Sequence, residues 1–137
     1  MKNQNVILDT GALVALINRN DPNHNWAVGE WMQLKPPVWT CEAVISETCF
    51  LLKRKYLTEV VFEMIEAGAI AIAFNLQAES SNIRSLMGRY ESVPMSFADA
   101  CLVRMSEQIL HSAVMTLDSD FQIYRQHRHQ EIPLIKP

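Results

Sequence analysis

Acidic side chains stand where two apolar segments of the sequence end. Asp9 closes the run N-V-I-L-D, and Asp118 follows the run A-V-M-T-L. Asp99 lies in the first turn of a helix that we expect Ser96 to cap. Ligands of open α/β sheets bind beyond the carboxyl ends of the strands. If the first and fourth strands are neighbours, the three aspartates are predicted to meet at one edge of the sheet.

Such a gathering of carboxylates indicates a bound cation. Like charges a few ångströms apart raise each other's pKa unless a cation neutralises them. Oxygen ligands without His or Cys suit Mg²⁺ or Mn²⁺ rather than zinc. A magnesium ion can lower the pKa of a water and stabilise charge on a phosphodiester. The pattern therefore predicts metal-dependent phosphoryl hydrolysis.

Each acid alone has a plainer explanation. Asp9 and Asp118 are well placed to cap helices, and Asp99 would complement a helix dipole. Glu47 differs, because it lies in a strongly apolar helix, where a buried glutamate needs a partner and a surface one does not. The prediction of a site rests on the four acids together.

Strand and helix patterns alternate along the chain. Short apolar runs indicate buried parallel strands, and the segments between them have helical patterns and caps. This alternation predicts an α/β fold with helices on both faces of a parallel sheet. The expected strands are Asn5–Asp9, Val38–Thr40, Ala69–Phe74, Ala113–Leu117 and Ile132–Ile135. The expected helices are Ala12–Asn18, one from Asp21, Glu42–Lys53, Leu57–Ala67, one that Asn75 or a neighbour caps and that runs to about Tyr90, one after Ser96, and one from Asp118 to about Arg125.

Composition is that of an ordinary globular domain. The 137 residues are 49% hydrophobic and 20% charged, so we expect one domain over residues 1–137. No apolar run is long enough to span a bilayer and no signal peptide is visible, which indicates no membrane partner and a cytoplasmic location. The three cysteines form no CxxC pair and are expected to be buried thiols.

Net charge neither indicates nor excludes a nucleic-acid partner. The formal charge is −3, which by itself argues against one. Five carboxylates belong to the predicted site once Asp120 is included. Without them, 12 basic side chains face 10 acidic ones, because 15 less 5 is 10. If a cation neutralises the site, the remaining surface is mildly basic.

Four short motifs resemble a known family. V-I-L-D-T-G-A-L (6–13), T-C-E-A-V-I-S-E (40–47), S-F-A-D-A (96–100) and T-L-D-S-D-F (116–121) resemble the successive motifs of PIN-domain ribonucleases. They are most similar to the VapC-type toxins of toxin–antitoxin pairs. The resemblance covers essentially the whole chain, with the motifs in the family's order and spacing.

The resemblance implies a role for each acid. Asp9, Asp99 and Asp118 match the family's metal-binding aspartates, and Glu47 matches the glutamate that helps to hold a metal or its water. These four are the expected catalytic residues.

Further implications concern accessory residues, fold and partners. Thr116 matches a hydroxyl position beside the last acid, and Asp120 a more variable accessory acid. The family fold is a three-layer α/β/α sandwich with an about five-stranded, mostly parallel sheet. Its members cut RNA with Mg²⁺ or Mn²⁺, commonly form homodimers and, as toxins, are silenced by a small antitoxin.

The expected activity is therefore that of an endoribonuclease that uses metal-activated water. Receiver domains and haloacid-type phosphatases are excluded, because the chain has no aspartate between Asp21 and Asp99 and no D-x-D at Asp9. Histidine-based ribonuclease chemistry is disfavoured, because no histidine follows an expected strand. A PIN-like module that binds RNA or protein without cleavage remains an alternative.

Two basic segments have open interpretations. The run 53–55 (K-R-K) would suit RNA phosphates or a helix C-terminus equally well. His127 and His129 form an H-x-H near Arg125 and Arg128, which indicates a solvated basic surface more than a metal site.

Overall fold

Five parallel strands form the central sheet in the computed structural model, which describes residues 4–137. The spatial order is β3-β2-β1-β4-β7, so the first strand lies in the middle. Every neighbouring pair is parallel, which confirms the predicted sheet. The strands are β1 (Asn5–Leu8), β2 (Val38–Thr40), β3 (Ile70–Ile72), β4 (Ser112–Met115) and β7 (Leu134–Ile135).

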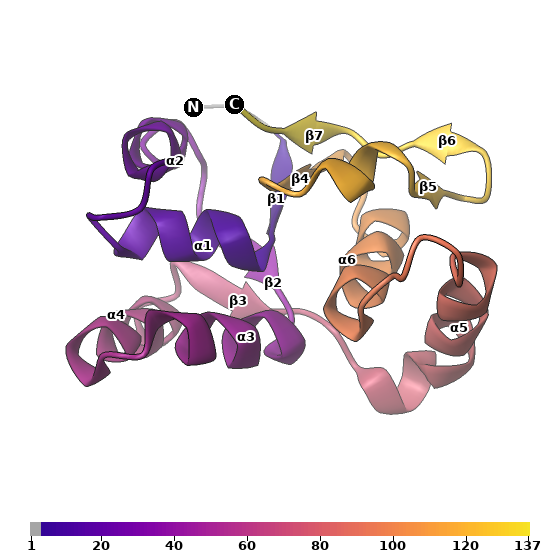
Figure 1. Cartoon of the computed structure of the whole chain (residues 1–137), viewed down its shortest axis with the longest axis horizontal. Coiled ribbons are helices and arrows are strands. Elements are labelled where there is room, and N and C mark those ends of the chain that lie inside the picture. Colours follow the sequence, from indigo (N-terminus) through magenta and orange to yellow (C-terminus); the bar gives the residue numbers. More distant parts are fainter. Residues whose placement is uncertain (1–3) are drawn as a thin grey trace.

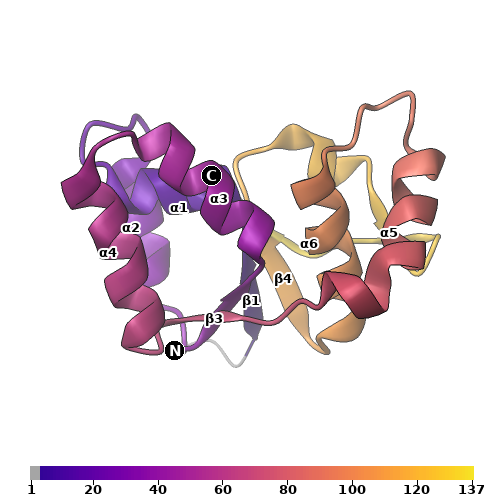
Figure 2. The ribbon, with the colours of Figure 1, turned by 90° about the horizontal axis from the view of Figure 1, so that it is seen from below.

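Helices cover both faces of this sheet. Figure 2 shows α1 to α4 on one side and α5 and α6 on the other, which confirms the three-layer α/β/α sandwich. Within residues 4–137, none of the helices has the length and apolarity that a bilayer crossing needs. The helices are α1 (Thr10–Ile17), α2 (His24–Trp31), α3 (Glu42–Leu52), α4 (Lys55–Glu66), α5 (Leu76–Arg89) and α6 (Phe97–Gln108).

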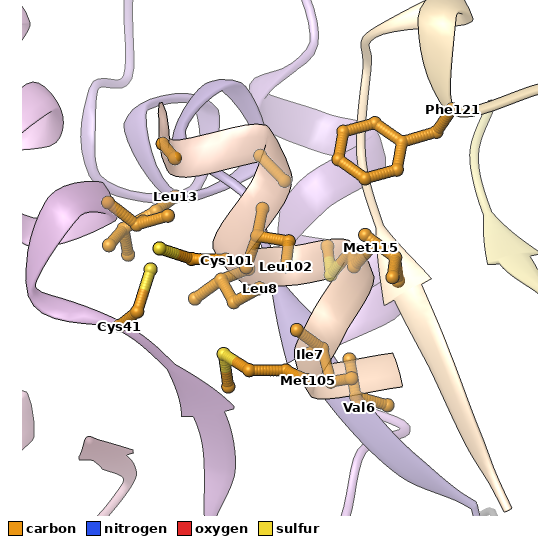
Figure 3. Packing of buried hydrophobic residues seen from close by; sticks show 14 of the residues in the cluster. Val6, Ile7, Leu8, Leu13, Cys41, Cys101, Leu102, Met105, Met115 and Phe121 are labelled. Carbon is orange, nitrogen blue, oxygen red and sulfur yellow. The ribbon is translucent and has the colours of Figure 1, made fainter. Parts of the chain in front are cut away.

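The core fills both faces of the sheet, and one of its layers lies between the two central strands and α6. Ile7 and Leu8 of β1 and Val114 of β4 are completely buried, as expected for strands covered on both faces. Figure 3 shows Leu102 and Met105 of α6 packed beside the β1 side chains. Burial at about 25 cal/mol per Å² of apolar surface makes this packing the main favourable term in folding.

Strand pairing brings the ends of β1 and β4 together. Leu8 is in register with Met115, and the amide of Asp9 donates to the Met115 carbonyl at 3.1 Å. The next residue on each strand, Asp9 or Thr116, therefore leaves the sheet at the same edge. This pairing meets the condition on which the predicted site depended.

Local caps begin two helices where the sequence predicted them. Asn75 accepts a hydrogen bond from the amide of Ala78 at the start of α5. Ser96 accepts one from the amide of Asp99 at the start of α6, at 3.0 Å. Both caps satisfy amides that have no partner inside their helix.

The segment after Asp118 differs from the expected helix. It forms one short 3₁₀ helix, η1 (Ser119–Gln122), and then a hairpin of β5 (Arg125–Gln126) and β6 (Gln130–Glu131) (Figure 1). Helical prediction to Arg125 was wrong because the hairpin turn contains no glycine or Asn-Gly signal. His127 and Arg128 adopt φ values of 49° and 70° instead.

Two of the three cysteines meet in the core. Cys41, which precedes α3, and Cys101 of α6 are each 1% exposed, and their thiols are close enough to act on each other's pKa. Figure 3 shows the two sulfur atoms facing one another. Cys49 is only partly buried, so burial is confirmed for two of the three thiols.

Candidate active site

Acidic side chains gather where β1 and β4 end, and we call this part of the sheet the acidic edge; its acids are Asp9, Glu47, Asp99, Asp118 and Asp120. Asp9 lies at its centre. It is 6% exposed and is the residue before α1, whose first amide it caps. Its Oδ1 accepts from the Thr10 amide at 2.7 Å, and its Oδ2 accepts from the Thr116 hydroxyl at 2.7 Å. Both carboxylate oxygens are therefore held in fixed directions.

Thr116 joins the acids of the two central strands. Its hydroxyl oxygen donates to Asp9 and accepts from the amide of Asp118 at 2.9 Å. The short side chain is buried, so this bridge is shielded from water. The hydroxyl position that the family resemblance implied thus lies between Asp9 and Asp118.

Burial and mutual repulsion act on the carboxylates. The pKa of Asp9 is raised from 3.8 to about 6, first by burial, against its two hydrogen bonds, and then by the charges of Asp99 and Asp118. Burial also raises the pKa of Asp99, and the charge of Asp118 adds to it. Three acids from distant parts of the sequence are therefore close enough to repel one another.

Tyr124 holds Asp99 from behind. Its ring is fully buried, and its hydroxyl donates to Oδ2 of Asp99 at 2.9 Å. Burial and this hydrogen bond raise the pKa of Tyr124, so the phenol stays a donor. Edge-to-face contacts with Tyr90 and Phe121, both at 5.2 Å, fix the ring. Sequence reasoning missed Tyr124 because it stands just before the hairpin that was not predicted.

Asp118 and Asp120 lie on the open side of the edge. Asp118 is exposed, and its Oδ1 accepts from the amide of Asp120 at 2.9 Å, which starts η1. The negative charges of both aspartates help to raise the pKa of Tyr124, so Asp120 lies near the other acids of the site. Its accessory role remains a prediction.

Glu47 reaches the same edge from α3. Its side chain is exposed, and Oε1 accepts from the Thr10 hydroxyl at 2.8 Å. Because the Thr10 amide also donates to Asp9, one threonine links the two acids. Sequence reasoning also missed Thr10 as a site residue. Its signal in the sequence is its position directly after Asp9.

The donors fit a hard divalent cation. Within residues 4–137, no three His, Cys, Asp or Glu side chains are placed closely enough to hold an ion among themselves. Magnesium does not require that, because it keeps several waters and takes one or two carboxylates together with substrate phosphate. The repulsion among Asp9, Asp99 and Asp118 is the charge that such an ion would neutralise. Metal binding by all three remains a prediction.

Comparison with known proteins identifies the family. The PIN domain family model matches residues 6–126. The chain belongs to the PIN domain family. This match confirms the resemblance that the sequence motifs indicated. PIN domains as a family are nucleases. Comparison with curated proteins gave no match.

A solved structure of the same fold belongs to a toxin. The crystal structure of Mycobacterium tuberculosis VapC20, described as a sarcin–ricin loop cleaving toxin, superposes on this PIN domain with a TM-score of 0.72. The two sequences are 22% identical over 86% of this chain and 93% of VapC20. At that identity the likeness shows a common fold.

The raised pKa of Asp9 predicts an inverted dependence of stability on pH. The folded protein holds the Asp9 proton more tightly than the unfolded chain does. The stabilisation is therefore complete below about pH 4 and is lost as the pH rises to about 6. For metal-free protein we expect this one group to cost about 3 kcal/mol of unfolding free energy between those limits.

Urea unfolding in chelator at several pH values measures this effect. Asp9→Asn should remove the loss, and so be more stable than wild type at neutral pH. Asp21→Asn is the matched control, because the Asp21 side chain accepts from the Asn23 amide, as an asparagine side chain can. Identical pH profiles for the two variants would contradict the assignment.

Proposed function

We propose that this PIN domain is a metal-dependent endoribonuclease that hydrolyses RNA phosphodiesters at the acidic edge of its sheet. The observation that carries the proposal is the buried carboxylate of Asp9. It is held by two hydrogen bonds and repelled by Asp99 and Asp118. A fold with no use for this charge would be more stable without it.

Asp9, Asp99 and Asp118 are the residues that would hold Mg²⁺ or Mn²⁺. When bound, the cation supplies neutralisation of the acids, a lowered pKa for water and stabilisation of charge on the phosphodiester. Hydrogen bonds from Thr10 and Thr116 to Asp9, from Tyr124 to Asp99 and from the Asp120 amide to Asp118 orient these carboxylates, and waters on the cation would span the remaining distances. Together these three acids and Glu47 make up the proposed catalytic set.

Glu47 is placed to handle the attacking water. Thr10 holds Oε1, and the exposed side chain leaves the second oxygen available to accept a proton from water. Thr116 keeps Asp9 and Asp118 in register, and Tyr124 keeps Asp99 from turning away. Thr10, Thr116 and Tyr124 therefore position the acids and do not themselves touch the scissile bond.

A module that binds RNA or protein without cutting it is the alternative. It would need neither an exposed Glu47 nor the repulsion among the aspartates. Cleavage of RNA by the purified protein distinguishes the two functions.

We expect metal-dependent products from a mixed RNA pool. Purified protein should cut with Mg²⁺ or Mn²⁺ and stop in chelator, as measured on denaturing gels. Asp118→Asn and Glu47→Gln should each lower the rate of cleavage about 100-fold. The first variant loses a carboxylate that would hold the cation, and the second loses the group that would accept a proton from the attacking water. Both side chains are exposed, so the fold is expected to survive. Asp21→Asn should retain full activity, and uncut RNA in every metal would favour the binding module.

Loss of the Tyr124 hydroxyl should weaken metal use. Tyr124→Phe keeps the ring and removes the donor to Asp99, a kind of change that costs about 10- to 100-fold in metal affinity or activity. The readout is the metal concentration that gives half-maximal cleavage, which should rise. Tyr56→Phe, at a position 67% exposed and outside the acidic edge, keeps its apolar ring and is the control, and the metal requirement should stay unchanged. An unchanged metal requirement in Tyr124→Phe would remove its positioning role.

We also propose a homodimer, and a small antitoxin as partner in the cytoplasm. Large apolar side chains are exposed on α3 and α4, and such surfaces are commonly covered by another chain. We expect light scattering to give twice the 15.6 kDa chain mass, and a short neighbouring reading frame to encode a protein that stops cleavage. A monomer at all concentrations would contradict the dimer. The exposed side chains are Phe50, Leu51, Tyr56, Val60 and Phe62.

A further inference from the structure

A basic cleft lies outside the acidic edge, between α5, α6 and the β5–β6 hairpin. Its volume is about 320 Å³, and three of the chain's seven arginines line it, one from each of these elements. The only large apolar side chain in its wall is Leu86. We call it the arginine cleft; the residues that define it are Arg89, Arg104, Arg128, His127, Glu107 and Asn82.

Arg104 is held in the wall of the cleft by two ion pairs. Its guanidinium pairs with Glu79 of α5 and with Glu107 of α6. The charges of both acids are thereby already engaged. Within residues 4–137, no carboxylate pairs with Arg89 or Arg128. The cleft therefore has two guanidinium groups that are available to an anion.

The hairpin tip is held against α6. The amide of His127 donates to Oε2 of Glu107 at 2.7 Å. His127 and Arg128 both have left-handed backbone conformations, which L side chains other than asparagine and aspartate seldom adopt. The contact of His127 with α6 thus helps to hold the neighbouring Arg128 in the wall of the cleft, although its backbone conformation is one that arginine seldom adopts.

The arginine cleft adjoins the acidic edge through shared elements. Arg104 and Glu107 follow Asp99 along α6 by about 8 to 12 Å of helix rise. On the other side, Tyr90 comes directly after Arg89 and contacts the ring of Tyr124, whose hydroxyl binds Asp99. An RNA strand could therefore reach from one to the other within a few nucleotides.

We propose that the arginine cleft binds the phosphate backbone of the RNA substrate, a few nucleotides from the bond that is cut. This rests on the proposed function. Guanidinium groups match phosphate oxygens in pairs, and such contacts set the register of RNA without reading its sequence. A docked protein would need apolar anchors, which this wall lacks apart from Leu86. The dipole of α5 accounts for Arg89 in its last turn, but not for Arg128.

RNA binding in chelator tests the arginine cleft without cleavage. The double variant Arg89→Gln/Arg128→Asn removes the two available charges, and asparagine tolerates the left-handed turn. Lys35→Gln/Arg19→Asn removes two exposed cations that lie outside α5, α6 and the hairpin and do not line the cleft, and it is the matched control. Circular dichroism checks that both fold. Affinity for a labelled stem–loop RNA is then measured by fluorescence anisotropy over a salt titration.

The cleft variant should bind RNA about tenfold more weakly than wild type, and its salt slope should fall by about 1 to 2. The control should lose about twofold, because distant charges are screened. Equal losses in the two variants, or no loss in either, would overturn the proposal. So would a poly-glutamate peptide that binds wild type more tightly than RNA does and loses that binding in the cleft variant.

The test separates this inference from the nuclease proposal. A cleft-dependent RNA affinity without metal-dependent cleavage would leave the cleft in place and remove the nuclease. Metal-dependent cleavage together with an RNA affinity that is the same in wild type and the cleft variant would support the nuclease and overturn the role of the cleft. Inorganic phosphate added as competitor distinguishes the sources of the anion. Free phosphate that binds at the cleft while the cleft variant retains wild-type RNA affinity would also overturn the proposal.

Discussion

The arrangement of the site depends on one buried negative charge, the Asp9 carboxylate at the end of β1. Asp9 leaves the sheet beside Thr116 because β1 and β4 pair in the middle of the sheet. Its carboxylate loses hydration there, and Asp99 and Asp118 repel it. A carboxylate in that position is stable only when hydrogen bonds and a cation replace water.

Hydroxyl groups supply the side-chain hydrogen bonds to the acids, beside the backbone amides of Thr10 and Asp120. Thr10, Thr116 and Tyr124 each donate to a different acid, namely Glu47, Asp9 and Asp99. A hydroxyl carries no charge, so it orients a carboxylate without competing with a cation for the site. A lysine or arginine in the same place would neutralise the group permanently. This choice of neutral donors is what makes the edge suitable for a metal rather than for a salt bridge.

The arrangement of charge also explains why the net charge of −3 is a poor guide to partners. Acids concentrate at the carboxyl edge of the sheet, whereas arginines concentrate on the α5 side of α6. Tyr124 donates to Asp99 of the acidic region, and its ring contacts Tyr90, which directly follows Arg89 of the cleft in the chain. A phosphate chain would meet positive charge on one side of this tyrosine pair and a cation site on the other.

The sequence by itself determined the sheet strands, the caps at Asn75 and Ser96, the family and the positions of the acids. These follow from periodicity, capping and short motifs, all of which are local properties. Only the tertiary structure decided which groups meet. Asp9 and Thr116 are 107 positions apart, and Asp99 and Tyr124 are 25 apart. The hairpin after Tyr124, the Cys41–Cys101 contact and the arginine cleft depend in the same way on packing against α6. No local pattern encodes such contacts, because they are stabilised by burial of surfaces that the chain brings together only when it folds.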